Sequence, residues 1–319
     1  MTKPQLPLEN ETKALFLVRD LSIEIDGKQI LAALNFEIPK GKIGAIIGES
    51  GAGKSTLIRL LAGQTKPTAG EIIFKNKKLE GPEFLIKGNL EITRVAQDFE
   101  LMPHISAAEN ILQSTFQLLD EERDRLATEL LKLFGLEKMA NQPTKELSGG
   151  EQQRVALAKS LASKTNVLLF DEVFSQLDLA TKANVLVQLK QLIKRKNKTA
   201  LFVLHDPQDA FYLADYVLVL QQGRLVQSGT LEEVYRYSAT SKIAGLFGLI
   251  NKMSAKRAAE LFPEIWGQFN RKNQNVWFRP NMAKTADLAS DFEVADEFFN
   301  GRGYVQMVKV GRTKLWLEV

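Results

Sequence analysis

The sequence predicts an α/β fold that is built on a largely parallel sheet and followed by a small β-rich domain. Three apolar runs, at 43–47, 167–170 and 200–204, have the length of buried strands. Each is followed by polar residues and then by apolar residues at helical spacing, which is typical of a parallel sheet covered by helices on both faces. From residue 275 onward, short runs rich in Val, Phe, Tyr and Trp are broken by glycines, as in a small β domain.

Local patterns place the elements around these strands. Residues 14–37 alternate apolar and polar side chains in two runs separated by Asp26 and Gly27, which predicts a hairpin. Between about 106 and 134 the spacing is helical and interrupts the strand–helix alternation. We therefore expect an inserted helical subdomain over about residues 98–163.

A change in character near residues 238–250 divides the chain. We expect residues 1–240 to form the α/β domain and residues 241–319 to form the β-rich domain. Within the second part, residues 254–262 have the pattern of one helix.

The composition indicates a protein of a reducing compartment. The chain has 319 residues, of which 45% are hydrophobic and none is cysteine, so it can form neither a disulfide nor a thiolate metal site. No apolar run is long enough to cross a bilayer, and residues 1–12 lack the apolar core of a signal peptide. We expect a cytoplasmic protein whose membrane role would come through partner subunits.

The net charge of +4 is modest, and much of the basic excess lies at residues 190–198. Such a run could attract acidic lipid or nucleic acid. A solvated helix end before a strand explains it better, so we expect no nucleic-acid partner.

A glycine-rich segment between a predicted strand and a predicted helix matches the phosphate-binding pattern G-x-x-x-x-G-K-[ST]. Its glycines let backbone N–H groups approach phosphates, and the helix N-terminus adds partial positive charge. We expect Lys54 to reach the β- and γ-phosphates of ATP and the Ser55 hydroxyl to ligate Mg²⁺. A chance glycine-rich turn is the alternative, and the strand and helix context argues against it. The expected nucleotide-binding residues here are Gly48, Glu49, Ser50, Gly51, Ala52, Gly53, Lys54, Ser55 and Thr56.

Two carboxylates follow the apolar run at 167–170. Ligands of parallel sheets lie beyond the carboxyl ends of the strands, where the glycine-rich segment also lies. Asp171 is suited to hold Mg²⁺, and Glu172 is suited to polarise an attacking water as general base. Acids after a strand are often only helix caps, but their combination with a phosphate-binding loop favours catalysis.

Four further motifs resemble those of the ATP-binding-cassette (ABC) ATPase family and follow in that family's order. The most specific is LSGGEQQR at 147–154, which resembles the family's signature sequence. Gln97 resembles the Q-loop glutamine, SQLD at 175–178 the D-loop, and His205 the switch histidine. The resemblance covers about residues 14–237. It implies a P-loop ATPase cassette with a parallel core sheet, an antiparallel β subdomain and a helical insert.

The resemblance also implies a head-to-tail dimer, of two copies or of paired cassettes, with two ATP molecules between the subunits. Gln97 would contact the metal and the attacking water, His205 would hold the γ-phosphate in line, and Asp178 would link the two sites. The signature residues would contact the nucleotide of the opposite subunit, with the N-terminus of the following helix directed at its phosphate. These residues are Ser148, Gly149, Gly150 and Gln152.

Two positions depart from the family pattern. Ile25 stands where an aromatic side chain usually stacks on adenine, so aliphatic packing would have to replace it. Val173 stands where a proline often follows the catalytic glutamate, and this change leaves the phosphate and metal contacts intact.

The segment 98–110 is similar to the region of importer ATPases that receives the coupling helix of a membrane subunit. We expect Phe99, Leu101 and Met102 to form part of a docking surface, with packing inside the helical insert as the alternative. Residues 223–251 continue to resemble importers of the sugar, polyamine, anion and ferric-ion group. The short β-rich end is similar to their regulatory, TOBE-like domain, for which substrate sensing, dimer contact and packing all stay open.

The function that the resemblance implies is an ATP-hydrolysing subunit that powers import of a small solute. Its partners would be transmembrane permease subunits and an extracytoplasmic solute-binding protein, with the chain bound peripherally to the inner face of the membrane. An exporter subunit is the alternative, although such subunits usually lack a C-terminal β domain. A soluble ABC machine of DNA repair or translation typically has a long coiled-coil insertion or two cassettes, and the sequence has neither.

Overall fold

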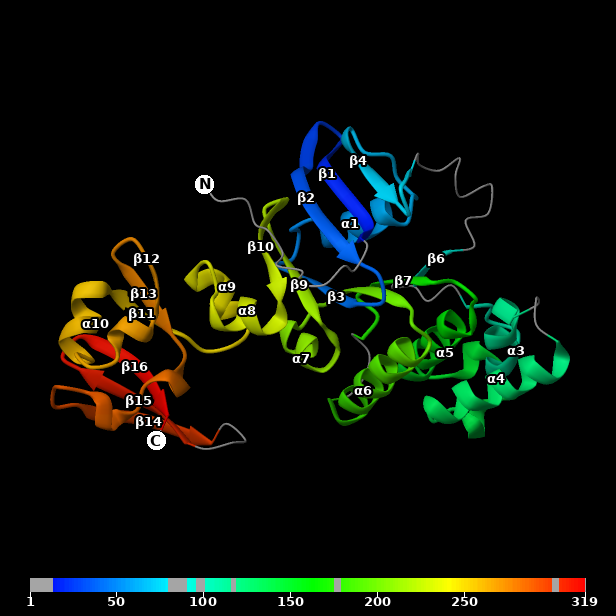
Figure 1. The fold of residues 1–319 in the computed structure, drawn as a ribbon. Helices are drawn as coiled ribbons and strands as arrows, with labels where there is room; N and C mark the ends of the chain where they lie inside the picture. Colours follow the sequence, from blue (N-terminus) through cyan, green and yellow to red (C-terminus); the bar gives the residue numbers. More distant parts are fainter. Residues whose placement is uncertain are drawn as a thin grey trace. The chain divides into compact units, whose positions relative to one another are not determined.

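The computed structural model describes residues 14–79, 91–95, 101–115, 119–174, 179–299 and 304–318. The chain divides into two compact units, Met1–Leu231 and Glu232–Val319 (Figure 1). Among the described residues, no helix is both long and apolar enough to span a bilayer.

Two sheets organise the first unit. An antiparallel sheet has the strand order β2-β1-β4-β5, and a second sheet has the order β10-β9-β3-β8-β7-β6, in which only β10 pairs antiparallel. The strands are β1 (Ala14–Ile25), β2 (Lys28–Pro39), β3 (Ile43–Ile47), β4 (Ala69–Phe74), β5 (Lys77–Lys78), β6 (Ile92–Val95), β7 (Val167–Asp171), β8 (Thr199–Val203), β9 (Tyr216–Gln221) and β10 (Arg224–Thr230).

Burial explains why the second sheet is parallel. Every residue of β3, β7 and β8 is buried, as expected for strands covered on both faces. The rings of Phe170 and Phe202, on neighbouring strands, stack with centroids 4.4 Å apart. Close packing also fixes a glycine in β3, because a Cβ on Gly44 would lie 2.4 Å from the Tyr216 ring.

Helices of the first unit surround this sheet or form the expected insert. The helices α3, α4 and α5 follow β6 in the chain and pack on one another before β7 (Figure 1). The predicted fold class, with an antiparallel subdomain, a parallel core sheet and a helical insert, is therefore confirmed. The α-helices are α1 (Lys54–Leu61), α3 (Ala107–Leu112), α4 (Asp120–Leu133), α5 (Gly149–Ala162), α6 (Leu179–Arg195) and α7 (Ala210–Leu213).

A buried lysine ties the end of α5 to the start of β8. Lys198 is 6% exposed, and its Nζ donates to the carbonyl oxygens of Ser163 at 2.7 Å and Thr165 at 2.6 Å. Burial, with a smaller contribution from the charge of Lys196, lowers the pKa of Lys198 to about 8. Between pH 8 and about 10.4 the unfolded chain therefore holds a proton on this lysine that the folded chain does not.

As the pH rises from 8 to 10, we expect the free energy of unfolding of the wild type to increase relative to that of Lys198→Met. The burial penalty of the charged ammonium is present below pH 8 and is relieved above it, and the methionine variant has no such contribution. Denaturant unfolding of both proteins at pH 7, 8.5 and 10 measures the difference. A difference between the two proteins that is constant over this range would contradict the depressed pKa.

The second unit contains two three-stranded antiparallel sheets, β11-β13-β12 and β14-β15-β16. Its β-rich character and one helix over residues 254–262 were predicted; the structure has that helix as α10 and adds the short helices α8 and α9. Its α-helices and strands are α8 (Leu231–Arg236), which begins at the end of the first unit, α9 (Ser241–Leu246), β11 (Asn251–Ser254), α10 (Ala255–Leu261), β12 (Asn270–Lys272), β13 (Asn275–Phe278), β14 (Glu293–Phe299), β15 (Tyr304–Val310) and β16 (Thr313–Glu318).

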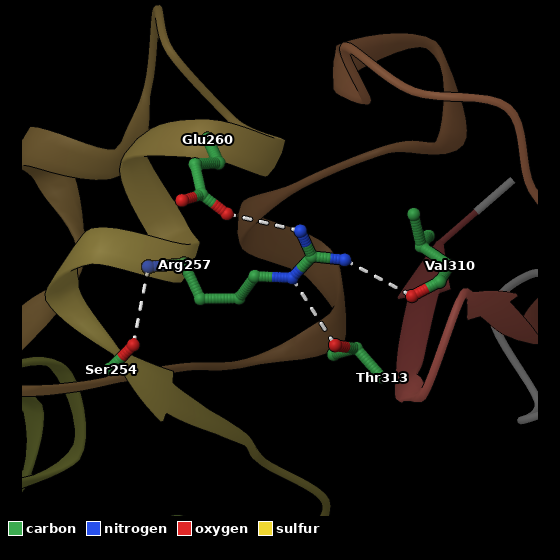
Figure 2. Close-up of polar contacts among 5 residues, drawn as sticks. All are labelled: Ser254, Arg257, Glu260, Val310 and Thr313. Carbon is green, nitrogen blue, oxygen red and sulfur yellow. Dashed lines mark hydrogen bonds and ion pairs between the residues drawn. The ribbon is translucent and has the colours of Figure 1, made fainter.

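An arginine joins α10 to the hairpin of β15 and β16 (Figure 2). Arg257 donates to the Val310 carbonyl at 3.1 Å and to Thr313 Oγ1 at 3.3 Å, and it pairs with Glu260 at 3.1 Å. Ser254 caps the helix by accepting from the backbone N–H of Arg257. These contacts fix the helix against the second sheet of the unit over an apolar core.

Candidate functional site

The glycine-rich loop lies between β3 and α1, and close packing requires glycine at its two ends. A Cβ on Gly48 would lie 2.2 Å from the Leu220 carbonyl oxygen. Gly53, the N-cap of α1, has a φ of +94°, and a Cβ there would lie 2.5 Å from Leu31 Cδ2. Both positions exclude a side chain, so the loop keeps a tight curve with its backbone amides available to a ligand.

Lys54 and Ser55 open the helix that follows this loop. The Lys54 side chain lies over the loop, where Nζ donates to the carbonyl oxygens of Gly48 at 3.0 Å and Glu49 at 3.1 Å. No side chain caps the N-terminus of α1, and its first turn carries no acidic residue. The helix end therefore favours an anion.

The carboxylates at the end of β7 lie against this helix. Ser55 Oγ donates to Asp171 Oδ1 at 2.7 Å, and Lys54 Nζ lies 4.0 Å from Glu172 Oε1. Asp171 is only 5% exposed. The structure thus brings Lys54, Ser55, Asp171 and Glu172 together, as the sequence predicted from the position of the strand ends.

Glu172 has an unusual backbone. Its φ is +54°, in the left-handed region that non-glycine residues rarely adopt, and its N–H donates to the Val203 carbonyl at 3.2 Å. Strained backbone of this kind is often found at functional sites. The strain supports a functional role for Glu172.

An arginine that the motifs do not include lies beside Asp171. Arg94, in β6, places Nη1 3.5 Å from Asp171 Oδ2, and its side chain is 15% exposed. A charged residue inside a short strand was the available sequence signal, but only the pairing of β6 with β7 connects it to the acid.

His205 follows β8, next to the end of β3. The N–H of Leu204 donates to the Ile46 carbonyl at 3.2 Å, which fixes this strand end, and the His205 side chain is exposed. Nearby, Asp209 pairs with Lys182 at 2.7 Å. Burial raises the pKa of Asp209, and the hydrogen bond from Lys182 opposes that rise.

The signature residues form the N-terminus of α5. Ser148 caps this helix: its Oγ accepts from the Glu151 N–H at 3.4 Å, while its own N–H and hydroxyl donate to the Glu151 carboxylate at 2.8 Å each. Those hydrogen bonds lower the pKa of Glu151. Gly149 and Gly150 form the first turn, so the helix end is directed outward without a bulky side chain.

Gln152 stabilises the turn before α5. Its amide donates to the carbonyl oxygens of Thr144 at 2.9 Å and Leu147 at 3.1 Å. The side-chain amide of Gln152 thus donates to backbone carbonyl groups of the protein, and its contact with nucleotide stays a prediction.

Other predicted residues lie at the edge of, or beyond, what the structure describes. Gln97, Phe99 and Asp178 lie outside the described residues, as does the rest of the segment 175–178. Ile25, at the end of β1, is 43% exposed and therefore accessible to a flat ligand.

A buried asparagine shapes the predicted docking loop. Asn110 is fully buried, accepts from the Met102 N–H at 2.9 Å and donates to the carbonyl oxygens of Met102 at 3.0 Å and Ser106 at 3.1 Å. Thr144 Oγ1 also donates to the Met102 carbonyl, at 2.8 Å. These bonds hold the loop with Met102 54% exposed, whereas Leu101 is half-buried.

The arrangement suits phosphate chemistry with a hard divalent cation. Among the described residues, no group of three or more His, Asp or Glu side chains could hold a metal ion. A cation at Ser55 and Asp171 would therefore need further oxygen ligands from phosphates and water, which is how Mg²⁺ usually binds beside nucleotides. The oxygen donors present fit Mg²⁺ on this basis.

Comparison with known proteins agrees with this geometry. The family model described as ABC transporter matches residues 31–175. The iron importer subunit "Fe(3+) ions import ATP-binding protein FbpC" of Vibrio cholerae is 34% identical over 76% of this chain and 68% of its own length. "Sulfate/thiosulfate import ATP-binding protein CysA" of Synechocystis is 33% identical over 88% of this chain and 79% of its own.

Solved structures of ABC cassettes match this chain as well. A dimeric bacterial ABC transporter cassette superposes with a TM-score of 0.61 and 31% identity, covering 68% of this chain and 98% of that one. A dimeric structure of a post-hydrolysis state with bound ADP and Pi matches equally well, with the same TM-score of 0.61 and 31% identity.

Proposed function

Because this chain belongs to the ABC transporter family of ATP-binding proteins, we propose that it is the ATP-hydrolysing subunit of an importer for a small solute. The observation that carries the proposal is the similarity to two import subunits over 76% and 88% of the chain. That similarity coincides with a site in which Lys54, Ser55, Asp171 and Glu172 meet. The names of these two relatives describe import, which favours the proposal over the exporter alternative.

Each residue of the site has a separate role in the proposed hydrolysis. The loop amides, Lys54 and the N-terminus of α1 bind the phosphates, and Ser55 and Asp171 would hold Mg²⁺, which when bound neutralises charge on the phosphate oxygens. Glu172 polarises the attacking water, and His205 holds the γ-phosphate in line. Gln97 also serves the metal and the water in this proposal.

Two cassettes complete the site in the proposed assembly. The N-terminus of α5, with Ser148, Gly149 and Gly150, faces the γ-phosphate bound by the partner, and Asp178 links the two sites. The exposed end of α5 and the dimeric form of the similar cassette support this arrangement. ATP binding closes the dimer and hydrolysis reopens it.

The membrane partners are permease subunits, and a solute-binding protein outside the membrane delivers the solute. The chain itself is bound at the inner face of the membrane, through the loop that presents Met102. The names of the two importer relatives make a ferric ion or a sulfur oxyanion the first candidates for the solute.

The docking loop yields a prediction of its own. Met102→Glu places a charge on the exposed apolar tip of the loop, where the coupling helix of a permease would bind. We expect transport to fall at least about tenfold, because burying an unpaired charge in an interface is strongly unfavourable. ATPase activity of the isolated chain is expected to stay unchanged, because Met102 lies outside the phosphate-binding site.

Uptake assays test this prediction, with Lys138→Glu as a matched control that also adds negative charge at an exposed position of the insert. Equal transport by Met102→Glu and the wild type would place the docking site elsewhere.

The proposed function is tested by uptake of labelled ferric iron and of labelled sulfate in cells that lack the gene. Reintroduced wild-type chain is expected to restore uptake of one of them, whereas Glu172→Gln is not. If efflux rather than uptake of a solute depends on the chain, the exporter alternative replaces the proposal.

A further inference from the structure

We propose that Arg94 is a built-in counter-ion of Asp171 that competes with Mg²⁺ for this carboxylate and so raises the Mg²⁺ concentration that the ATPase needs. The inference rests on the proposed function, in which Asp171 faces Mg²⁺. It makes Arg94 a positioning residue, which acts on the metal through Asp171.

The sheet fixes the position of Arg94. In the parallel pair of β6 and β7, Arg94 lies opposite Leu169 and Val95 lies opposite Phe170, one residue before Asp171. From this position Arg94 Nη1 comes within 3.5 Å of Asp171 Oδ2. Because both residues belong to strands of the core sheet, the pair is held by backbone pairing and not by two mobile loops.

Both oxygens of the Asp171 carboxylate have a donor from the protein. Oδ1 accepts from Ser55 Oγ at 2.7 Å, and Oδ2 lies 3.5 Å from Arg94 Nη1. The side chains of Arg94 and Asp171 are 15% and 7% exposed, so water screens this pair weakly. Any cation that binds at Asp171 must therefore share an oxygen with Ser55 or with Arg94.

The charges of the site are already matched within the chain. Glu172 lies 4.0 Å from Lys54, and Asp171 lies 3.5 Å from Arg94. In the proposed function Lys54 binds the phosphates of the nucleotide, because it is the first residue of the helix that follows the phosphate-binding loop. Arg94 is held next to Asp171 by the pairing of β6 with β7, so its positive charge stays beside this carboxylate and opposes the approach of a divalent cation.

A purely structural ion pair and a competing counter-ion have different consequences. Removing a structural pair lowers stability by the same amount with and without Mg²⁺. Removing a competing counter-ion lowers stability in the absence of Mg²⁺, because Asp171 is then buried without a partner cation, and it strengthens Mg²⁺ binding.

The test compares the wild type with Arg94→Met, which removes the charge and keeps an unbranched side chain, and with Arg94→Lys, which keeps the charge. Binding of ADP is measured by calorimetry at a series of free Mg²⁺ concentrations and constant ionic strength, and melting temperatures are measured with and without Mg²⁺. Arg19→Met is the matched control, because it removes an exposed arginine that pairs with Glu71 in the same unit.

We expect the Mg²⁺ concentration that gives half-maximal enhancement of ADP binding to fall on the order of tenfold in Arg94→Met. The values for Arg94→Lys and Arg19→Met are expected to stay within about twofold of the wild type. Without Mg²⁺, the melting temperature of Arg94→Met is expected to be lower than that of the wild type. Adding Mg²⁺ and ADP is expected to reduce this difference in melting temperature. Should Arg94→Met not fold, Arg94→Gln takes its place, with the same direction of change.

An unchanged Mg²⁺ requirement in a folded, less stable Arg94→Met would overturn the inference and leave Arg94 with a structural role. A wild type whose ADP binding does not respond to Mg²⁺ at all would instead contradict the Mg²⁺ site at Ser55 and Asp171 in the proposed function. The two failures are therefore distinguishable.

Discussion

Replacing Glu172 with glutamine is expected to slow ATP hydrolysis by at least about 100-fold while ATP binding persists. Glu172 directly follows β7 at the end of the core sheet, has a φ of +54°, and places its Oε1 4.0 Å from Lys54 Nζ. Glutamine keeps the size of the side chain and its ability to accept a hydrogen bond from water. It removes the negative charge that makes Glu172 a base.

Phosphate release by the purified chain measures this effect, and fluorescent-nucleotide binding checks that ATP still binds. Glu146→Gln is a matched control, because Glu146 is an exposed glutamate of the same unit. Hydrolysis by Glu172→Gln at more than about a tenth of the wild-type rate would exclude Glu172 as the general base.

Lys54→Ala is expected to weaken ATP binding by roughly 100-fold, because charge-assisted contacts with phosphates are among the strongest polar interactions. The Lys54 ammonium lies over the phosphate-binding loop, 3.0 Å from the Gly48 carbonyl and 3.1 Å from the Glu49 carbonyl. It is 7% exposed, so its charge acts with little screening from water.

Nucleotide titration monitored by fluorescence or calorimetry measures the change. Lys66→Ala, which removes an exposed lysine that follows α1, is expected to bind ATP like the wild type. Wild-type affinity in Lys54→Ala would mean that the nucleotide binds away from the glycine-rich loop.

Local sequence patterns were sufficient to predict the fold class because each element has a clear pattern of apolar residues and glycines. The buried strands β3 and β7 are largely apolar runs, and the glycines at the two ends of the loop before α1, Gly48 and Gly53, are required by contacts with Leu220 and Leu31. The phosphate-binding loop and the acids after β7 could be related before the structure was known, because ligands of parallel sheets gather at the same strand ends.

Features that depend on pairing between distant segments were not predictable in this way. Arg94 lies beside Asp171 only because β6 and β7 are neighbours, and nothing in the four residues of β6 indicates that neighbour. Asn110 shapes the docking loop through bonds to Met102, eight residues earlier, which helical spacing alone does not reveal. Of the helices of the second unit, α10 was predicted from its spacing, whereas α8 and α9 have only six residues each and were missed.

The proposed role of the signature residues can be tested against a matched control, because α5 and α3 begin with the same kind of helix cap. Ser148 with Glu151 caps α5, and Ser106 with Glu109 caps α3 through the same pair of hydrogen bonds. An arginine at either serine removes a helix cap, but only the arginine at Ser148 would enter the proposed site of the partner's phosphate. The two substitutions therefore separate loss of the cap from loss of the shared site.

Sizing of these variants in ATP and Mg²⁺ tests most directly that two chains form the ATP sites between them. Glu172→Gln is expected to elute as a dimer, and so is Glu172→Gln combined with Ser106→Arg, whereas Glu172→Gln combined with Ser148→Arg stays a monomer. A dimer that forms equally well with Ser148→Arg, or no ATP-dependent dimer of Glu172→Gln, would contradict the head-to-tail site.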